Sequence, residues 1–318
     1  MKASKFILSV IENGYKIPFV SEPPPFAAKN KSSLDHQPFV DKALKDLILN
    51  GCIQAVEEEP YCCNPLTVAG KAEKLRLVLD LRHVNTYVHL KSFRHEDLHT
   101  LAEMFKKGDY FFIFDLKSGY HHVSIHPDSV KYLGFKWTFL NGRTRFFVFL
   151  VLPFGLNDAS HIFTKLTRPL VEKWRGQGIK SIVYIDDGIN GKKTYDEAKK
   201  ASERVATDLK DAGFIVNKKK CNWEPAQEGK WLGMMINTRT MSFTVPPEKL
   251  QKLKKQTKRV LESKNNQREE VGIPCGDIIG DELSHWASSA SSHASHVRRC
   301  CEKRELVLTT APERRCPR

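Results

Sequence analysis

The sequence predicts an α+β fold in which antiparallel strands are backed by helices. Short runs of β-forming apolar residues alternate along the chain with segments whose apolar residues recur every three or four positions. Some neighbouring runs are joined by connections of only a few residues, such as Asn141-Gly142, which is a strong cue for an antiparallel hairpin. Helices interleaved with hairpin-paired strands favour α+β over a doubly wound parallel sheet.

The first third of the chain predicts an arm, a helix and a strand pair. Residues 1–33 are expected to form an extended N-terminal arm, because the run Pro23-Pro24-Pro25 excludes helix and central strand there. A helix follows, and Asn50-Gly51 supplies its C-terminal stop. Two strands, 66–68 and 75–80, come next, joined by residues 70–73. The apolar positions of the helix are Phe39, Val40, Ala43, Leu44, Leu47 and Ile48.

The middle of the chain alternates strands and helices. Composition makes 110–114 a buried strand, and residues 137–147 read as a hairpin around Asn-Gly. A helix begins near Asn157, with Pro169 as a point where it can kink. The remaining expected elements are an Asp-Asp hairpin, a helix from 195 to 212 closed by Gly213, and strands at 214–216 and 231–236.

The balance of charge points to a polyanionic partner. The chain of 318 residues holds 51 Lys and Arg against 37 Asp and Glu, a formal net charge of +14. Such a surplus predicts binding to nucleic acid or to an anionic membrane surface. No apolar run reaches the length of a signal peptide core or a membrane span, and the eight cysteines lack disulfide-scaffold or zinc spacing. We therefore expect no membrane partner and an intracellular protein, cytoplasmic and/or nuclear.

Three carboxylates stand where a divalent cation is expected. Asp186 and Asp187 are adjacent and flanked by apolar runs, so ionising both is costly unless a cation neutralises them. The alternative is a surface Asp-Asp-Gly hairpin turn. Asp115 ends the buried strand 110–114, and its own alternative is a turn residue that ends a strand. Together the three acids could hold two Mg²⁺ ions about 3.5–4 Å apart.

Several blocks then form a recognisable series. Phe-Asp-Leu-Lys-Ser-Gly-Tyr at 114–120, Leu-Pro-Phe-Gly-Leu at 152–156 and Tyr-Ile-Asp-Asp at 184–187 stand in order, with further matches at 75–85, 121–127, 217–221 and 231–233. Over roughly residues 34–250 the chain resembles reverse transcriptases of retroelements, in the gypsy-like LTR and DIRS-type branch. The resemblance implies a right-hand polymerase fold, with fingers and palm in 34–245 and a truncated thumb that starts in 246–262.

The resemblance also implies a catalytic set. Asp115, Asp186 and Asp187 match the acids that bind two Mg²⁺ ions, with Mn²⁺ as a substitute. Lys220, or its neighbour Lys219, matches a position proposed to protonate the leaving pyrophosphate. Three consecutive lysines, at 218–220, also suit a generic phosphate-binding surface, so both readings stay open.

Five positions match the family's nucleotide site. Tyr120 stands where the family places an aromatic barrier to a ribose 2′-hydroxyl; its alternative is an ordinary buried aromatic. Arg76 and Lys71 match cations that hold the incoming triphosphate, although either could be a solvated strand charge. Phe154 and Gly155 fit the loop beneath the template–nucleotide pair, and no hydrogen-bonding role carries over to Phe154, because some relatives have Gln there.

A last block matches the hairpin that holds the primer 3′ end. It comprises Trp231, Leu232, Gly233 and Met234, for which a plain core strand is equally compatible. The implied partners are an RNA or DNA template with its primer and deoxynucleoside triphosphates. The sequence leaves the oligomeric state open.

Three functions follow as hypotheses. The first is an RNA-directed DNA polymerase of a retrotransposon, which adds deoxynucleotides to a primer 3′-hydroxyl by two-metal nucleotidyl transfer. The second is a catalytically inactive, truncated remnant that only binds nucleic acid. It is motivated by residues 263–318, where periodicity is lost and the sequence reads as a disordered basic tail or an out-of-frame segment. A third, another metal-dependent phosphoryl enzyme, is disfavoured because nuclease-type acid clusters are missing elsewhere.

Overall fold

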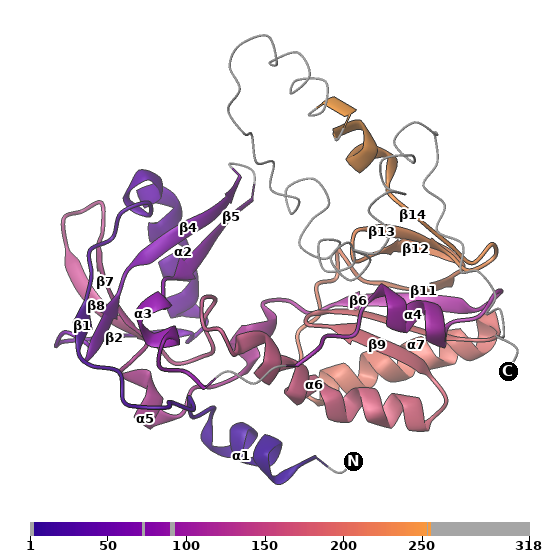
Figure 1. Cartoon of the computed structure of the whole chain (residues 1–318), viewed down its shortest axis with the longest axis horizontal. Helices are drawn as coiled ribbons and strands as arrows, with labels where there is room; N and C mark the ends of the chain where they lie inside the picture. The colour runs from indigo at the N-terminus through magenta and orange to yellow at the C-terminus, as the bar shows by residue number, and fades with distance from the viewer. Residues whose placement is uncertain (1–2, 72–73, 90–92, 253, 256–318) are drawn as a thin grey trace, which may run out of the picture.

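The computed structural model describes residues 3–71, 74–89, 93–252 and 254–255 (Figure 1). The expectation of an extended arm over 1–33 was wrong for Lys5–Asn13, which forms helix α1. The hydroxyl of Ser4 accepts a hydrogen bond from Ile7 N and begins the helix, and Gly14, at φ 82°, ends it. The triple proline itself lies outside any helix or strand, as expected.

A five-stranded sheet forms the fingers. Its order is β1-β3-β7-β8-β2, and helix α2 (Gln37–Leu49) ends at Asn50-Gly51 as predicted. The hairpin around Asn141-Gly142 is confirmed, with Thr138 paired to Thr144 across it. The strands are β1 (Phe26–Ala27), β2 (Ile53–Val56), β3 (Cys62–Asn64), β7 (Gly134–Thr138) and β8 (Thr144–Phe149). A short 3-10 helix, η1 (Leu34–His36), precedes α2.

A two-stranded ribbon projects from the fingers (Figure 1). It consists of β4 (Leu66–Lys71) and β5 (Lys74–Leu79), which confirms the predicted strand pair. Helix α3 (Arg82–Asn85) follows β5 directly and brings the chain back to the base of the fingers.

The palm is a four-stranded antiparallel sheet of order β11-β6-β10-β9. Helices α6 (Ala159–Gly176) and α7 (Tyr195–Asp211) cover one face of it, and α6 continues past Pro169 (Figure 1). Side chains of β6 alternate between two cores, since Phe112 and Phe114 belong to one cluster and Phe111 and Ile113 to the other. The strands are β6 (Tyr110–Asp115), β9 (Lys180–Tyr184), β10 (Asp187–Lys192) and β11 (Asn222–Ala226).

The opposite face of the palm carries a small sheet, β12 (Glu228–Trp231), β13 (Met234–Asn237) and β14 (Ser242–Thr244). The single run expected at 231–236 is therefore two strands. They are separated by a tight turn at Leu232-Gly233, where φ is 43° and 71°, as a hairpin turn with two left-handed residues requires. The strand expected at 214–216 is also wrong: Val216 makes only an isolated bridge with Leu116.

The remaining elements are short. They are α4 (Leu98–Met104), η2 (Gly119–His122) and α5 (Pro127–Val130). Of the expected thumb start at 246–262, residues 247–252 are helical, and most of the rest lies outside the described residues. The tail expected at 263–318 lies wholly outside them. Among the helices described, none has the length and apolar character needed to cross a membrane.

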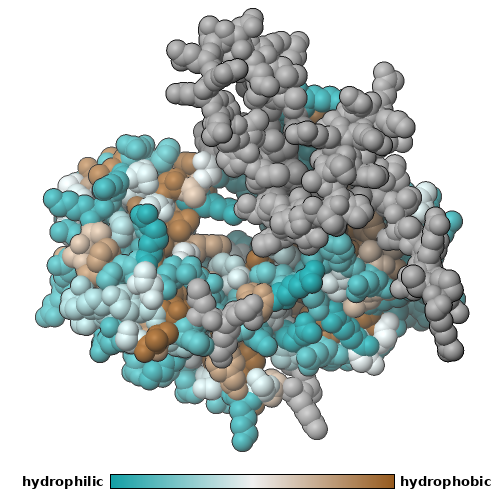
Figure 2. Space-filling model, in the orientation of Figure 1, coloured by the Kyte–Doolittle hydropathy of each residue, from teal (hydrophilic) through white to brown (hydrophobic). Residues whose placement is uncertain are grey.

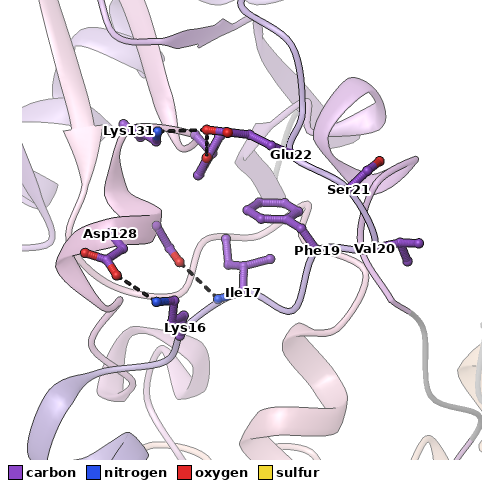
Figure 3. A pocket seen from close by; sticks show the side chains of 10 residues that line it. Lys16, Ile17, Phe19, Val20, Ser21, Glu22, Asp128 and Lys131 are labelled. Atoms are coloured by element: carbon purple, nitrogen blue, oxygen red, sulfur yellow. Dashed lines mark hydrogen bonds and ion pairs between the residues drawn. The ribbon is translucent and has the colours of Figure 1, made fainter.

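The visible face of the fingers and palm is mostly hydrophilic, with apolar side chains scattered over it (Figure 2). A surface cavity of about 440 Å³ lies between residues 16–22 of the arm and α5 (Figure 3). Its charged side chains pair with one another, Lys16 with Asp128 and Lys131 with Glu22. None of the predicted site residues lines it.

Candidate active site

The turn between β9 and β10 places two aspartates at the end of the palm sheet. Tyr184 pairs with Asp187, so Ile185 and Asp186 form a two-residue turn. Ile185 has φ 54°, a left-handed conformation that is strained for a β-branched residue. The carbonyl of Asp186 accepts a hydrogen bond from Leu116 N at 2.8 Å, which ties the turn to the end of β6. This is a packed turn against a neighbouring strand rather than a free surface hairpin.

Asp115 and Asp187 face each other across two neighbouring strands. Their Cα positions are paired in the register of β6 with β10, and Asp115 is only 3% exposed. Burial, the charge of Asp186 and a hydrogen bond with the Asp115 carboxyl raise the pKa of Asp187 to about 7. Burial also raises the pKa of Asp186, and the charge of Asp115 adds to the rise. The three predicted acids therefore come together in a place where negative charge is poorly compensated.

Lys220 supplies a cation to this group. Its Nζ lies 2.5 Å from Asp115 Oδ2, and the hydrogen bond to Asp115 raises the pKa of Lys220. The lysine is held in place through the backbone: Asn217 N donates to the Asp115 carbonyl at 2.8 Å, and Asp115 N donates to Cys221 Sγ at 3.3 Å. Of the two lysines that the sequence left open, Lys220 rather than Lys219 is the one seen to reach a carboxylate.

The donor set suits a hard divalent cation. Carboxylate oxygens are the ligands that Mg²⁺ and Mn²⁺ prefer, and the pKa values of Asp186 and Asp187 are raised, first by burial and then by the neighbouring acids, even with Lys220 close by. In the described part of the chain, no group of three His, Cys, Asp or Glu side chains is arranged to hold a metal ion. Since the Lys220 ammonium group is bonded to Asp115, a cation at these acids would compete with Lys220 for Asp115.

Tyr120 stands beside the carboxylates, on the short helix η2. Its ring centroid lies 5.1 Å from that of Phe154 and 5.9 Å from that of Phe163. Burial, together with the charge of Asp186, raises the pKa of Tyr120 to about 12. The preceding residue is Gly119, where a Cβ would lie 3.0 Å from Phe163 and 3.4 Å from the Cβ of Asp186. The ring is therefore fixed between the acids and the loop that carries Phe154.

The loop at 153–156 is anchored to the end of β5. Gly155 has φ 118°, and a Cβ there would lie 2.0 Å from the carbonyl oxygen of Leu79, so only glycine fits. Leu79 N donates to the Phe154 carbonyl at 3.1 Å. Asn85 holds the same loop from α3, donating from Nδ2 to the Gly155 carbonyl at 2.8 Å and accepting from Asn157 N at 3.0 Å. The sequence had placed Asn85 in a matching block without assigning it this role.

The two predicted triphosphate cations lie on the ribbon. Arg76 is an exposed residue of β5, and its charge acts on Asp186, where it opposes the rise in pKa. Lys71 is the last residue of β4, paired with Lys74, and its side chain lies outside the described part of the chain. The structure thus relates Arg76 to the carboxylates and leaves the role of Lys71 as a prediction.

The predicted primer-holding residues divide into core and turn. Trp231, Leu232 and Met234 are 2%, 5% and 2% exposed and belong to the core cluster between the small sheet and the palm. Gly233 lies at the turn between β12 and β13. The core alternative therefore describes the three side chains, and a primer-holding role for the turn stays a prediction.

Fold and site together define a right-hand polymerase, with an antiparallel palm that carries three acids and fingers that carry a basic ribbon. A family model described as reverse transcriptase (RNA-dependent DNA polymerase) matches residues 66–236, more than half of the chain. The chain belongs to the reverse transcriptase family. Its branch within that family, gypsy-like or DIRS-type, stays a prediction.

The curated relatives are transposon polyproteins. A retrovirus-related Pol polyprotein from transposon opus of Drosophila melanogaster is 26% identical over 232 residues, which cover 68% of this chain and 22% of the relative. The Tf2-3 polyprotein of Schizosaccharomyces pombe is 22% identical over 318 residues, which cover 94% of this chain and 22% of the relative. The chain thus spans about a fifth of the length of these relatives.

Solved structures with the same fold include foamy viral enzymes. The foamy viral protease-reverse transcriptase dRH in complex with double-stranded DNA is 25% identical, with a TM-score of 0.61 over 77% of this chain and 42% of that one. The foamy viral protease-reverse transcriptase in complex with an RNA/DNA hybrid is 23% identical, with a TM-score of 0.64 over 79% of this chain and 34% of that one. The second likeness concerns the fold alone.

Proposed function

We propose that this chain is the RNA-directed DNA polymerase of a retrotransposon, which adds deoxynucleotides to a primer 3′-hydroxyl. The observation that carries the proposal is the pairing of Asp115 with Asp187 beside Asp186, with Lys220 bonded to Asp115 and Tyr120 close to Asp186. Family membership and transposon relatives support it. Acids, a proton donor and a side chain that can contact the sugar are what nucleotidyl transfer needs in one place.

In the proposed reaction the primer 3′-oxygen attacks the α-phosphorus of a deoxynucleoside triphosphate. A new P–O bond forms, the bond from that phosphorus to the bridging oxygen breaks, and pyrophosphate leaves. Asp115, Asp186 and Asp187 would hold two Mg²⁺ ions, or Mn²⁺ in their place. Bound there, the metal supplies charge that lowers the pKa of the attacking hydroxyl and stabilises the leaving oxygen.

The other predicted residues would bind the triphosphate, exclude ribonucleotides and donate a proton. Lys220 holds its ammonium group at the acids and can give a proton to the departing pyrophosphate. Arg76 and Lys71 would bind the triphosphate from the ribbon, and the ring of Tyr120 would exclude a ribose 2′-hydroxyl by its bulk. Phe154, 38% exposed and in contact with Tyr120, offers a flat surface beneath the nucleotide.

The proposed partners are a primed RNA or DNA template and deoxynucleoside triphosphates. The net charge of +14 supports a polyanionic partner, and the foamy viral neighbours were solved with double-stranded DNA and with an RNA/DNA hybrid. We place the protein inside the cell, in the cytoplasm and/or nucleus. The free thiols of Cys52, Cys62, Cys63 and Cys221 support a reducing compartment.

Product analysis tests the proposal against its alternatives. The chain is incubated with a labelled deoxynucleotide, a primed RNA template and Mg²⁺ or Mn²⁺, and the label is followed on a denaturing gel. The proposal expects label added to the primer, and only where the template base is complementary. Salt-sensitive binding without extension under either metal would instead identify a remnant that binds nucleic acid, and label in a hydrolysed or cyclised nucleotide would identify another phosphoryl enzyme.

A further inference from the structure

Both ring nitrogens of His122 are bonded to the backbone of two different segments. Nδ1 lies 3.0 Å from the carbonyl oxygen of Gly119, and Nε2 lies 3.1 Å from the amide nitrogen of Ile215. A carbonyl only accepts and an amide N–H only donates, so Nδ1 carries the proton and Nε2 is the acceptor. The imidazole therefore bridges the backbone at Gly119 and the backbone at Ile215, and its tautomer is fixed.

On one side, His122 bonds the segment 215–217, which pairs with the chain at the end of β6. Beyond the end of β6, the chain pairs with residues 215–217: Asn217 N donates to Asp115 O at 2.8 Å, and Lys117 N donates to Ile215 O at 2.7 Å. The pairing then stops, because Ser118 has φ 54° and turns the chain away. In a regular antiparallel pairing Ile215 N would donate to the carbonyl of Lys117, and His122 Nε2 supplies the acceptor instead. This segment leads directly to Lys220.

On the other side the bridge holds the turn that carries Tyr120. The bonded carbonyl belongs to Gly119, which precedes Tyr120 and lies against Asp186 and Phe163 so closely that a Cβ would crowd both. The His122 ring also lies 5.4 Å from that of Phe214, between the same two segments. One side chain thus fixes the distance between the ring that would select the sugar and the segment that leads to Lys220.

We propose that His122 is a positioning residue for nucleotide selection, which holds the Tyr120 turn in register with the segment that leads to Lys220. The inference rests on the proposed polymerase function, because it assigns a residue to the same site. The hydrogen bonds of the His122 ring go to the backbone of Gly119 and Ile215, so the residue acts through these two positions. Loss of the bridge therefore affects which nucleotide is accepted more than the chemical step.

The test compares three proteins in steady-state primer extension with deoxy- and ribonucleotides. His122→Phe keeps a ring against Phe214 but loses both hydrogen bonds. We expect the KM for deoxynucleotide to rise about tenfold and the discrimination against ribonucleotide to fall about tenfold. The kcat for deoxynucleotide should change less than threefold. His122→Asn can still donate to Gly119 O and should recover part of the discrimination. Wild-type KM and discrimination in His122→Phe would overturn the proposal, as would an Asn variant no better than Phe.

A matched variant and a spectroscopic readout separate positioning from stability. His126 also bonds a backbone amide, that of Asp128 at 3.2 Å, but on the fingers side, so His126→Phe should leave KM and discrimination unchanged. Equal losses in the two variants would overturn the inference.

Nitrogen-15 NMR of the labelled imidazole should show His122 protonated at Nδ1 only, whether or not the chain polymerises. A signal from the form protonated at Nε2 would contradict the bridge. A wild-type chain without extension defeats the proposed function, whereas failure of the bridge leaves wild-type extension intact.

Discussion

Asp115 and Asp187 lie directly opposite each other on β6 and β10, and this register brings the acids of two distant sequence blocks together. A shift by one residue would turn one of the two side chains to the other face of the sheet. Gly188 helps to fix the register, because a Cβ there would lie 2.2 Å from the ring of Phe114 on the opposite strand. The pairing of the two acids thus depends on the contact between Gly188 and Phe114 next to them. It has measurable effects on the free energy of unfolding.

Asp187→Asn should stabilise the metal-free protein at alkaline pH. The pKa of Asp187 is raised to about 7 in the folded state, from about 3.9 in an unfolded chain, so its ionisation opposes folding. The penalty is nearly absent below about pH 4, grows as pH rises and is complete above about pH 7. Since the carboxyl is partly solvated, we expect a gain on the order of 1–2 kcal/mol at pH 8.

Urea denaturation at pH 4, 6 and 8 with a chelator present measures this gain. The difference between Asp187→Asn and wild type should increase with pH and should shrink when Mg²⁺ is added, because a cation binds the three acids of the wild type more tightly than the two that remain in the variant. A difference that is the same at all three pH values would show that Asp187 does not titrate as described.

Lys220→Met should impair extension far more than Lys219→Met. Both changes remove one positive charge from the same lysine run, but only Lys220 has its ammonium group on the Asp115 carboxylate. If Lys220 protonates the leaving pyrophosphate, single-turnover extension should fall about 10²-fold in Lys220→Met. Lys219→Met should change the rate less than threefold and mainly weaken template binding at high salt. Equal losses in the two variants would indicate a generic phosphate-binding surface.

Gly155→Ala should disable the loop that carries Phe154. Its φ of 118° is strained for alanine, and the new methyl group would meet the carbonyl of Leu79 at 2.0 Å. We expect a loss of about 2 kcal/mol or more in unfolding free energy and at least a tenfold rise in the KM for deoxynucleotide. Gly142→Ala is the matched control, since its φ is 76° but no atom lies within 4 Å of the added carbon.

In Gly142→Ala, thermal denaturation should report a cost of about 1 kcal/mol with KM unchanged. A Gly155→Ala protein with wild-type KM would show that the anchoring of the loop to β5 does not position the nucleotide.

Tyr120→Val should relax sugar selection. The ring is buried between Phe154, Phe163 and the acids, so a smaller side chain opens space where a ribose 2′-hydroxyl would lie. Discrimination against ribonucleotides should fall about tenfold or more, measured as the ratio of kcat/KM values. Tyr120→Phe keeps the ring and should keep the discrimination; if Tyr120→Val also keeps it, Tyr120 is an ordinary core aromatic.

The sequence predicted elements whose signal is local. The Asn141-Gly142 hairpin, the helix that ends at Asn50-Gly51 and the buried strand before Asp115 each carry their own turn, cap or composition. Helix α1 was missed because the proline run of the arm was extended over residues that have a serine cap and their own apolar face. The turn at Leu232-Gly233 was hidden because a left-handed leucine carries no sequence signal.

The grouping of the three acids was predicted from the order of motifs, whereas the residues that support them depend on tertiary contacts. The sequence matched Lys220, with Lys219 as the alternative, and the fold shows that the ammonium group of Lys220 reaches Asp115. The roles of Asn85 and His122 were missed for the same reason, because each bonds backbone that is 70 or more residues away in sequence. Such contacts follow from the packing of whole segments and leave no local pattern.

The most direct test of the account is extension of oligo(dT) on poly(rA) with labelled deoxythymidine triphosphate and Mg²⁺, by wild type and by Asp186→Asn. The substitution removes one of the three acidic charges with little change in size. We predict template-dependent extension by the wild-type chain and a loss of about 10³-fold or more in Asp186→Asn, with the primer–template still bound. Extension by Asp186→Asn at the wild-type rate would contradict the assignment of this site.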